Sequence, residues 1–310
     1  MVRSYILLLF CVCCWGSNFV FGSILVNEFP PILLSAMRLS ATSLFLIGYG
    51  WYFKKMGQLT RRDFLLLVPL GFVGTLINQA SFFTGLETID ATTASLVLSL
   101  APITVAVLAA VFLKETITRK MVIGSLIAMV GIFFVVGKSG GIKPSIGMLY
   151  ILLAMVSFAI SIIIMRKLTE RIDPLTATVY STVIGSSMVI PVALIKEPIT
   201  HVSSHPWAWV LLFVTAILMQ GLCGLIWNVQ LKRIGAGKAS VFLNLQPFVA
   251  MVVGFLLLGT PVTMVQIVGS LLIVGGVVLA TGFKKEKSEA SSGKPVTASG
   301  MIQKLPKVNG

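Results

Sequence analysis

Long apolar runs separated by short polar stretches fill the chain from residue 5 to residue 283. Each run has about 20 residues, the length that a helix needs to cross the hydrocarbon core of a bilayer. The runs are continuous, whereas strands of a membrane β-barrel alternate apolar and polar positions. The pattern predicts an all-α polytopic membrane protein with ten transmembrane helices. The expected helices are at about 5–26, 32–53, 64–85, 92–113, 120–137, 146–165, 175–195, 207–229, 239–258 and 263–283.

The composition supports lipid as the solvent of this protein. Apolar residues make up 56% of the 310 residues and charged residues 11%, whereas a soluble domain carries about 25% charged residues. The net charge of +14 does not indicate nucleic-acid binding, because the basic residues lie in loops between the apolar runs and in the tail. The N-terminal segment resembles a signal peptide, but its apolar run continues to Val26 and therefore predicts an uncleaved first helix.

Lys and Arg are divided unequally between the two sets of alternate loops. One set, with the two termini, holds 20 of the 24 basic residues; the other holds Lys138, Lys143 and Lys196, and Arg38 lies inside the second helix. Basic loops stay in the cytoplasm, so we expect a multi-pass protein of the cell (inner or plasma) membrane with both termini cytoplasmic. Residues 284–310 are polar and lack apolar periodicity, which predicts a disordered cytoplasmic tail.

The two halves of the chain repeat each other. With a shift of 145 residues, the segment 94–137 matches 239–282 at 13 of 44 positions, without a gap. Five helices per half is an odd number, so the second repeat must enter the membrane from the opposite side. The sequence therefore predicts a first five-helix repeat in 1–140 and an inverted repeat in 145–283. Inverted repeats of this kind are typical of secondary transporters.

Several motifs in this order resemble a known family. They are Trp15-Gly16-Ser17-Asn18, Pro31 followed by Arg38, Leu100-Ala101-Pro102, the run Leu113 to Thr118, and then Gly124 and Gly131. Together they resemble the EamA-type transporters of the drug/metabolite transporter superfamily over residues 4–283. The resemblance implies a ten-helix transporter with a central cavity that exports or exchanges amino acids, related metabolites or toxic compounds. In the second half, Gly259-Thr260-Pro261 replaces Lys114-Glu115-Thr116, so Glu115 has no counterpart by symmetry.

Polar side chains and prolines within the apolar runs are the candidate functional residues, because such groups must pair or face a cavity. Arg38 is the only charge well inside a run. It either anchors a substrate carboxylate or the outer gate, or it snorkels outward or pairs with Glu28. Pro102 and Pro247 hold repeat-related positions and predict two interrupted helices at a gate near a midplane site. Including Arg38, the candidate substrate-binding residues are Trp15, Asn18, Arg38, Asn78, Gln79, Phe82, Ser99, Gln220, Trp227, Asn228, Asn244 and Gln246.

Glu115 has two interpretations. It either couples transport to an ion, or it caps a helix or forms a loop ion pair with Lys114 or Arg119. None of the ten Asp and Glu residues lies mid-helix, which argues against an embedded proton-coupling carboxylate. The amide-rich and aromatic set without a carboxylate suits a zwitterionic or neutral, partly apolar solute.

The leading hypothesis is a secondary transporter that exports amino acids, related metabolites or drugs by alternating access. One alternative is an importer or exchanger of a sugar derivative, nucleotide or vitamin; another is a membrane protein with a structural or signalling role. Catalysis is not expected, because the apolar runs contain neither paired Asp nor His-Glu-x-x-His. The expected partners are a small-molecule solute, the lipid bilayer and a second copy of the chain in a homodimer. We expect no nucleic acid, metal or cofactor.

Overall fold

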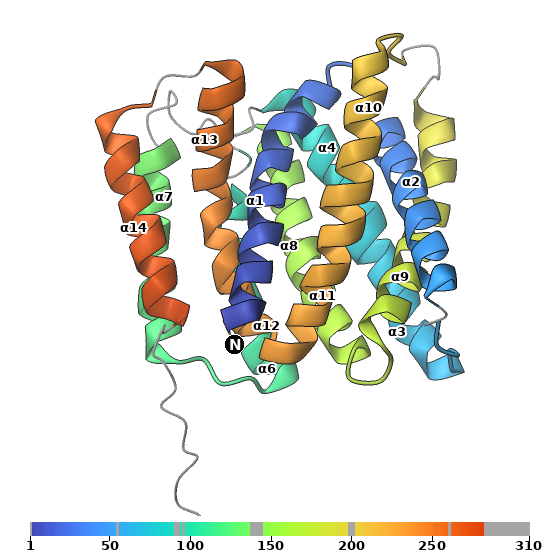
Figure 1. Ribbon diagram of the computed structural model, residues 1–310, viewed down its shortest axis with the longest axis horizontal. Helices are drawn as coiled ribbons and strands as arrows, with labels where there is room; N and C mark the ends of the chain where they lie inside the picture. The colour runs from blue at the N-terminus through green and yellow to red at the C-terminus, as the bar shows by residue number, and fades with distance from the viewer. Residues whose placement is uncertain are drawn as a thin grey trace, which may run out of the picture.

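The computed structural model describes residues 2–53, 56–89, 94, 97–136, 145–197, 202–259 and 262–281. Helices make up nearly all of this part of the chain (Figure 1). The first half contains α1 (Val2–Leu25), α2 (Pro31–Tyr52), α3 (Arg61–Gly71), η1 (Phe72–Ile77), α4 (Asn78–Thr88), α6 (Ala101–Leu113) and α7 (Arg119–Val136). The second half contains α8 (Ile146–Leu168), α9 (Pro174–Lys196), α10 (Pro206–Val214), η3 (Thr215–Leu222), α11 (Cys223–Ile234), α12 (Ala236–Ser240), η4 (Val241–Leu245), α13 (Gln246–Leu258) and α14 (Met264–Thr281).

The helices form a polytopic membrane protein, as the sequence predicts. Within the described residues, eight helical spans are long and apolar enough to cross a bilayer. Helix lies in each of the ten expected ranges, but α6 has only 13 described residues, and α7 begins with the charged pair Arg119 and Lys120. The number of membrane-crossing helices therefore stays a prediction. The expected tail at 284–310 lies outside the described residues.

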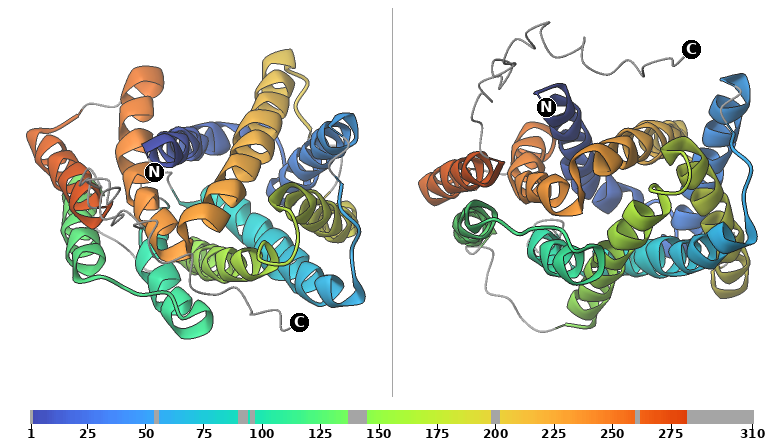
Figure 2. Two further views of the ribbon diagram at one scale, coloured as in Figure 1. Left: turned by 60° about the horizontal axis from the view of Figure 1, so that its bottom comes forward. Right: turned by 90° about the horizontal axis from the view of Figure 1, so that it is seen from below.

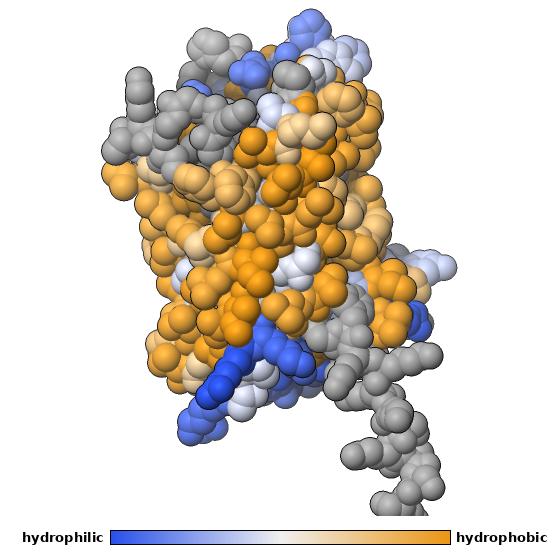
Figure 3. All heavy atoms as spheres, turned by 90° about the vertical axis from the view of Figure 1, so that its left-hand side faces the viewer, coloured by the Kyte–Doolittle hydropathy of each residue, from blue (hydrophilic) through white to orange (hydrophobic). Residues whose placement is uncertain are grey.

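An apolar surface surrounds the bundle. Figure 3 shows hydrophobic side chains over the middle of one face and hydrophilic ones toward its two ends. Large apolar side chains such as Leu44, Phe112 and Leu271 are exposed. A soluble protein rarely exposes contiguous apolar surface on this scale, so the exposed band indicates contact with lipid chains.

Helix pairing arranges the bundle. The α7 and α14 helices lie side by side at one edge (Figures 1 and 2). The α2 helix packs against α9, and α1 packs against α13 while α8 packs against α6 and α4. At the α7–α14 contact, Gly124 faces Gly276 and Gly131 faces Gly269, so closely that a Cβ on Gly124, Gly131 or Gly276 would overlap the opposite backbone. Along this contact the residue number increases in α7 while it decreases in α14, so the two helices are antiparallel.

Three of the long spans are not regular α-helices throughout. The span α3–α4 contains the π-helical segment η1, and the span α10–α11 contains the π-helical segment η3. The span α12–α13 is interrupted by the 3-10 segment η4. With the repeat shift of 145 residues, η1 falls on 217–222, inside η3. Such interruptions often mark functional sites, and both π segments lie beside the cavity described next.

Candidate functional site

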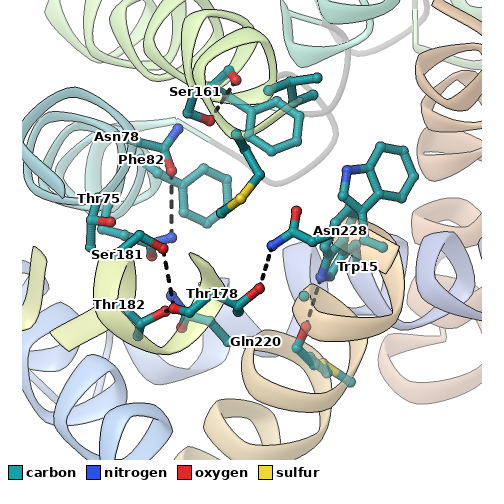
Figure 4. A pocket seen from close by; sticks show the side chains of 18 of the residues that line it. Trp15, Thr75, Asn78, Phe82, Ser161, Thr178, Ser181, Thr182, Gln220 and Asn228 are labelled. Atoms are coloured by element: carbon teal, nitrogen blue, oxygen red, sulfur yellow. Dashed lines mark hydrogen bonds between the residues drawn. The ribbon is translucent and has the colours of Figure 1, made fainter. Parts of the chain in front are cut away.

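A cavity of about 250 Å³ lies between the helices of the two halves. Its wall comes from α1, α2, the spans α3–α4 and α10–α11, α8, α9 and the start of α13, with Leu98 in addition. Figure 4 shows polar side chains from several of these helices turned toward one another. No acidic side chain belongs to this wall in the part of the chain that the structure describes. The cavity therefore suits a solute that is not a simple cation.

Ten of the twelve candidate substrate-binding residues line this cavity. They are Trp15, Asn18, Arg38, Asn78, Gln79, Phe82, Gln220, Trp227, Asn228 and Gln246. The other two, Ser99 and Asn244, are buried but are not part of the wall. The sequence pattern placed these residues on the faces of separate helices, and the fold brings them together from five different spans.

Arg38 is the one charged residue in the described wall. Its side chain is 2% exposed, and its Nη2 donates to Asn18 Oδ1 at 2.7 Å. The guanidinium lies over the ring of Phe83, with Cζ 5.1 Å from the ring centroid. Its Nε and Nη1 atoms are buried without a hydrogen-bond partner. A buried cation with unpaired donors is costly, so the geometry favours an anionic group as the missing partner.

Two alternatives for Arg38 do not describe this structure. A snorkelling side chain would be exposed, whereas Arg38 is almost completely buried. Glu28 is engaged elsewhere, because its carboxylate accepts a short hydrogen bond from Ser203 Oγ. No ion pair joins Arg38 to a carboxylate among the described residues. The structure is therefore consistent with Arg38 as an anchor and contradicts both snorkelling and the pairing with Glu28.

A wall of hydroxyl groups on α8 and α9 was not foreseen. It consists of Ser161, Thr178, Ser181 and Thr182, with Thr75 of η1 beside them. Thr178 Oγ1 accepts a hydrogen bond from Asn228 Nδ2 at 2.9 Å, which links α9 to α11 across the cavity (Figure 4). Ser and Thr are easy to overlook in membrane helices because they satisfy their hydroxyls on their own backbone, as Thr182 does on Thr178 O. The signal present in the sequence is the i, i+3, i+4 spacing of the three α9 residues.

Aromatic rings form the apolar part of the wall. Trp15 and Trp227 have ring centroids 4.9 Å apart, and Phe158 meets Trp15 edge-on at 6.3 Å. Phe19 and Phe82 form a second edge-to-face pair at 5.8 Å. Phe19 and Phe158 were not among the candidates, because an isolated Phe in an apolar run has no distinguishing pattern. Together these rings give the cavity an apolar surface next to Arg38 and the amides.

The π segment η3 provides backbone acceptors for the first half of the chain. Trp15 Nε1 donates to Met219 O at 2.7 Å, and Thr42 Oγ1 donates to Ala216 O at 2.9 Å. A π turn leaves carbonyl groups outside the regular α-helical ladder, so they can accept such side-chain bonds. The orientation of Trp15 in the cavity wall thus depends on an irregular helix of the other half.

The prolines mark helix starts in the structure. Pro102 and Pro247 each occupy one of the first two positions of α6 and α13, where a proline is tolerated because its missing N–H is not required. The turn Ser99–Leu100 precedes α6, and the 3-10 segment η4 precedes α13. Ser240 Oγ donates to Pro102 O at 3.4 Å. Helix interruptions therefore occur next to both repeat-related prolines. In the second half, Pro247 directly follows the cavity residue Gln246.

Glu115 joins three separate elements at the lower end of the bundle in Figure 1, the end at which α1 begins. Its Oε1 and Oε2 atoms accept hydrogen bonds from Ala236 N at 3.0 Å and Gly237 N at 2.9 Å. Arg166 Nε of α8 lies 3.6 Å from Oε1. The predicted ion pair of Glu115 with Lys114 or Arg119 is not found among the described residues. The carboxylate instead caps the start of α12 and pairs with Arg166.

The fold and the cavity define a multi-helix membrane protein built to enclose a small solute. A family model described as "EamA-like transporter family" matches twice, at residues 2–137 and 145–282. The chain belongs to the EamA-like transporter family, and it is a transporter rather than an enzyme.

Known proteins agree with this assignment. The chain is 32% identical over 289 residues to "Uncharacterized transporter YyaM" of Bacillus subtilis, covering 91% of this chain and 94% of that protein. It is 27% identical over 219 residues to the "Probable terminal-alkyne amino-acid exporter" of Streptantibioticus cattleyicolor, covering 70% and 73% of the two chains. A solved crystal structure of an 18% identical protein superposes with a TM-score of 0.78, covering 91% of this chain and 99% of that one, and shows the fold alone.

Proposed function

We propose that this transporter exports amino acids or closely related metabolites across the cell membrane by alternating access. The observation that carries the proposal is Arg38, a buried cation without a carboxylate partner in the described wall of the cavity. A substrate carboxylate would accept a charge-assisted hydrogen bond from one of its two unpaired donors, Nε or Nη1. One relative is described as an amino-acid exporter, which favours both the solute class and the direction.

The packing supports two inverted five-helix repeats, which alternating access requires in this kind of fold. Gly124 and Gly131 of α7 correspond to Gly269 and Gly276 of α14 under the repeat shift. Gly124 contacts Gly276, and Gly131 contacts Gly269, which is the reciprocal pattern that a two-fold axis produces. The contacts of α1 with α13 and of α8 with α6 are related in the same way. These relations favour ten spans in two halves.

The charge distribution supports cytoplasmic termini. Among the described residues, twelve Lys and Arg residues lie at or next to helix ends that form the lower end of the bundle in Figure 1, whereas Lys196 is the last residue of α9, whose final turn is at the upper end. Cytoplasmic ends of membrane proteins are rich in Lys and Arg. The lower end, with the N-terminus, would therefore face the cytoplasm. Export would then load the cavity from the lower end.

The irregular segments supply joints for the conformational change. Pro102 and Pro247 lie in the first turns of α6 and α13, after interruptions, and the π segments η1 and η3 line the cavity at repeat-related positions. Paired interruptions of this kind permit one half to move against the other. Glu115 acts as a structural clamp of the lower end, since backbone N–H groups and Arg166 already occupy its oxygens.

Overproduction in bacteria tests this proposal. Growth is measured against a panel of toxic amino acids, amino-acid analogues and drugs, with Gln246→Ala and Arg38→Gln as cavity variants. Gln58→Ala, in an exposed loop, is the matched control. Resistance to amino-acid analogues that both cavity variants lose and the control keeps is the expected result. New sensitivity would indicate uptake instead, and unchanged growth with every amino-acid analogue would contradict the proposed solute class.

A further inference from the structure

The cavity contains more than one unpaired polar atom. In addition to Arg38 Nε and Nη1, the acceptor Gln220 Oε1 and the donor Trp227 Nε1 are buried without a hydrogen-bond partner. All three residues line the same cavity. Buried polar groups in proteins are nearly always paired, so three unpaired residues in one wall outline the polar groups of a ligand.

The three positions have different chemistry. Arg38 requires an anion or acceptor, Gln220 Oε1 requires a donor, and Trp227 Nε1 requires an acceptor. An α-amino acid supplies the first two with its carboxylate and its ammonium group. The third position is left for a polar atom on the side chain of the substrate.

The spacing along α1 fits this division. Arg38 donates a hydrogen bond to Asn18, and Trp227 packs against Trp15 in a tilted arrangement with ring centroids 4.9 Å apart. Asn18 and Trp15 are three residues apart on one helix, a rise of about 4.5 Å. The contacts that Trp227 and Arg38 make with α1 are thus about one helical turn apart, a span that the side chain of an amino acid can bridge. The rings of Trp15 and Phe158 also line the cavity and meet each other edge-on beside Trp227, so an apolar stem suits this part of the wall.

We infer that the transported amino acid has a hydrogen-bond acceptor on an otherwise apolar side chain, and that Trp227 Nε1 donates to this acceptor. An ether, carbonyl or amide oxygen three or four bonds from Cα is the chemistry that fits. The inference rests on the proposed function, since it takes the carboxylate at Arg38 as given. It adds Trp227 as the residue that reads the side chain of the substrate.

An isosteric pair of amino acids tests the inference. Norleucine and O-methylhomoserine have side chains of nearly equal shape, but the second has an ether oxygen in place of a methylene group. The dissociation constant of each is measured from the thermal stabilisation of the purified full-length protein in detergent. The variants are Trp227→Phe, which removes the indole N–H, and Trp207→Phe, an exposed control at the start of α10.

The wild type and Trp207→Phe should bind O-methylhomoserine about three to ten times more tightly than norleucine, the factor expected for one neutral hydrogen bond. In Trp227→Phe the ratio of the two dissociation constants should fall to about one. A general loss of packing weakens the binding of both amino acids equally, so it does not change this ratio. Equal binding of the two amino acids by the wild type overturns the inference, even where the variant folds poorly. A preference that persists in Trp227→Phe also overturns it. Failure of the proposed function is distinct, because then neither amino acid stabilises the protein.

Discussion

Gly124 of α7 and Gly276 of α14 meet backbone to backbone, and a Cβ built on either one would overlap the carbonyl oxygen of the other. The contact is reciprocal, although the two residues belong to different halves of the chain. Without a hydrophobic driving force in lipid, such close approach supplies the packing energy between helices. The α7–α14 pair, at one edge of the bundle in Figure 1, therefore depends on glycine at these positions.

Replacement of Gly276 by alanine should destabilise the protein. The added methyl group meets Gly124 O, Ala128 N and Ala128 Cβ, and overpacking of this kind costs about 1–3 kcal/mol. Gly275 is the matched control, because a Cβ there meets nothing within 4 Å. Gly275→Ala should leave stability unchanged or raise it by up to about 1 kcal/mol, the intrinsic helix preference of alanine. Apparent melting temperatures in detergent measure both; equal shifts in the two variants would contradict the close contact.

Replacement of Glu115 by glutamine should lower stability without changing the pH dependence of transport. Glutamine keeps one acceptor oxygen for Ala236 N or Gly237 N and loses the other, as well as the ion pair with Arg166. The expected loss is about 1–3 kcal/mol. A coupling carboxylate would instead shift or abolish the pH dependence of flux in Glu115→Gln.

Glu170→Gln is the control for that experiment. Glu170 also pairs with Arg166, at 3.2 Å, but its side chain is 55% exposed. Exposed ion pairs contribute about 0–1 kcal/mol, so this variant should melt close to the wild type.

Replacement of Trp15 by phenylalanine should weaken the contact between α1 and the π segment η3. The change removes the hydrogen bond that Trp15 donates to Met219 O, at a cost of about 0.5–1.5 kcal/mol. Trp51→Phe is the control, since Trp51 is 81% exposed. We expect a lower melting temperature and slower flux for Trp15→Phe alone; wild-type values for both properties would show that the hydrogen bond does not position this wall.

Gln246 and Asn244 should differ in their effects on transport. Gln246 lines the cavity, whereas Asn244 is buried in η4 and is not part of the wall. Gln246→Ala should raise the substrate concentration needed for half-maximal flux, and Asn244→Ala should leave it unchanged. The reverse order would show that the substrate contacts η4 rather than the cavity.

The sequence predicted what depends on apolar length and charge. Long continuous apolar runs gave α1, α2, α8 and α9 close to their observed bounds, because a membrane helix satisfies its own backbone and requires little tertiary information. The π segments were not predictable, because their extra residue per turn leaves no mark on apolar periodicity. Polar side chains such as those of Arg38 and Gln246 are costly in contact with lipid, so they face the cavity. The same cost made them identifiable in the sequence as candidates.

Partners across the bundle could not be predicted. Glu115 was expected to pair with a sequence neighbour, yet its contacts are Ala236, Gly237 and Arg166, which only the three-dimensional packing of separate spans brings within reach. The hydroxyls on α9 were missed because each one also bonds to its own helix, as in Thr178 Oγ1 to Pro174 O at 2.6 Å. Sequence thus identifies isolated polar residues better than it identifies their neighbours.

Solute flux in proteoliposomes tests the central claim most directly. Purified wild type, Arg38→Gln and the exposed helix-end control Arg62→Gln are reconstituted at equal density, and the exchange of labelled amino acids is followed against empty liposomes. We predict saturable flux of at least one amino acid in the wild type and Arg62→Gln, and none in Arg38→Gln, because the substrate carboxylate has lost its anchor. Saturable amino-acid flux that is undiminished in Arg38→Gln, or wild-type flux no greater than in empty liposomes for every amino acid, would contradict the account.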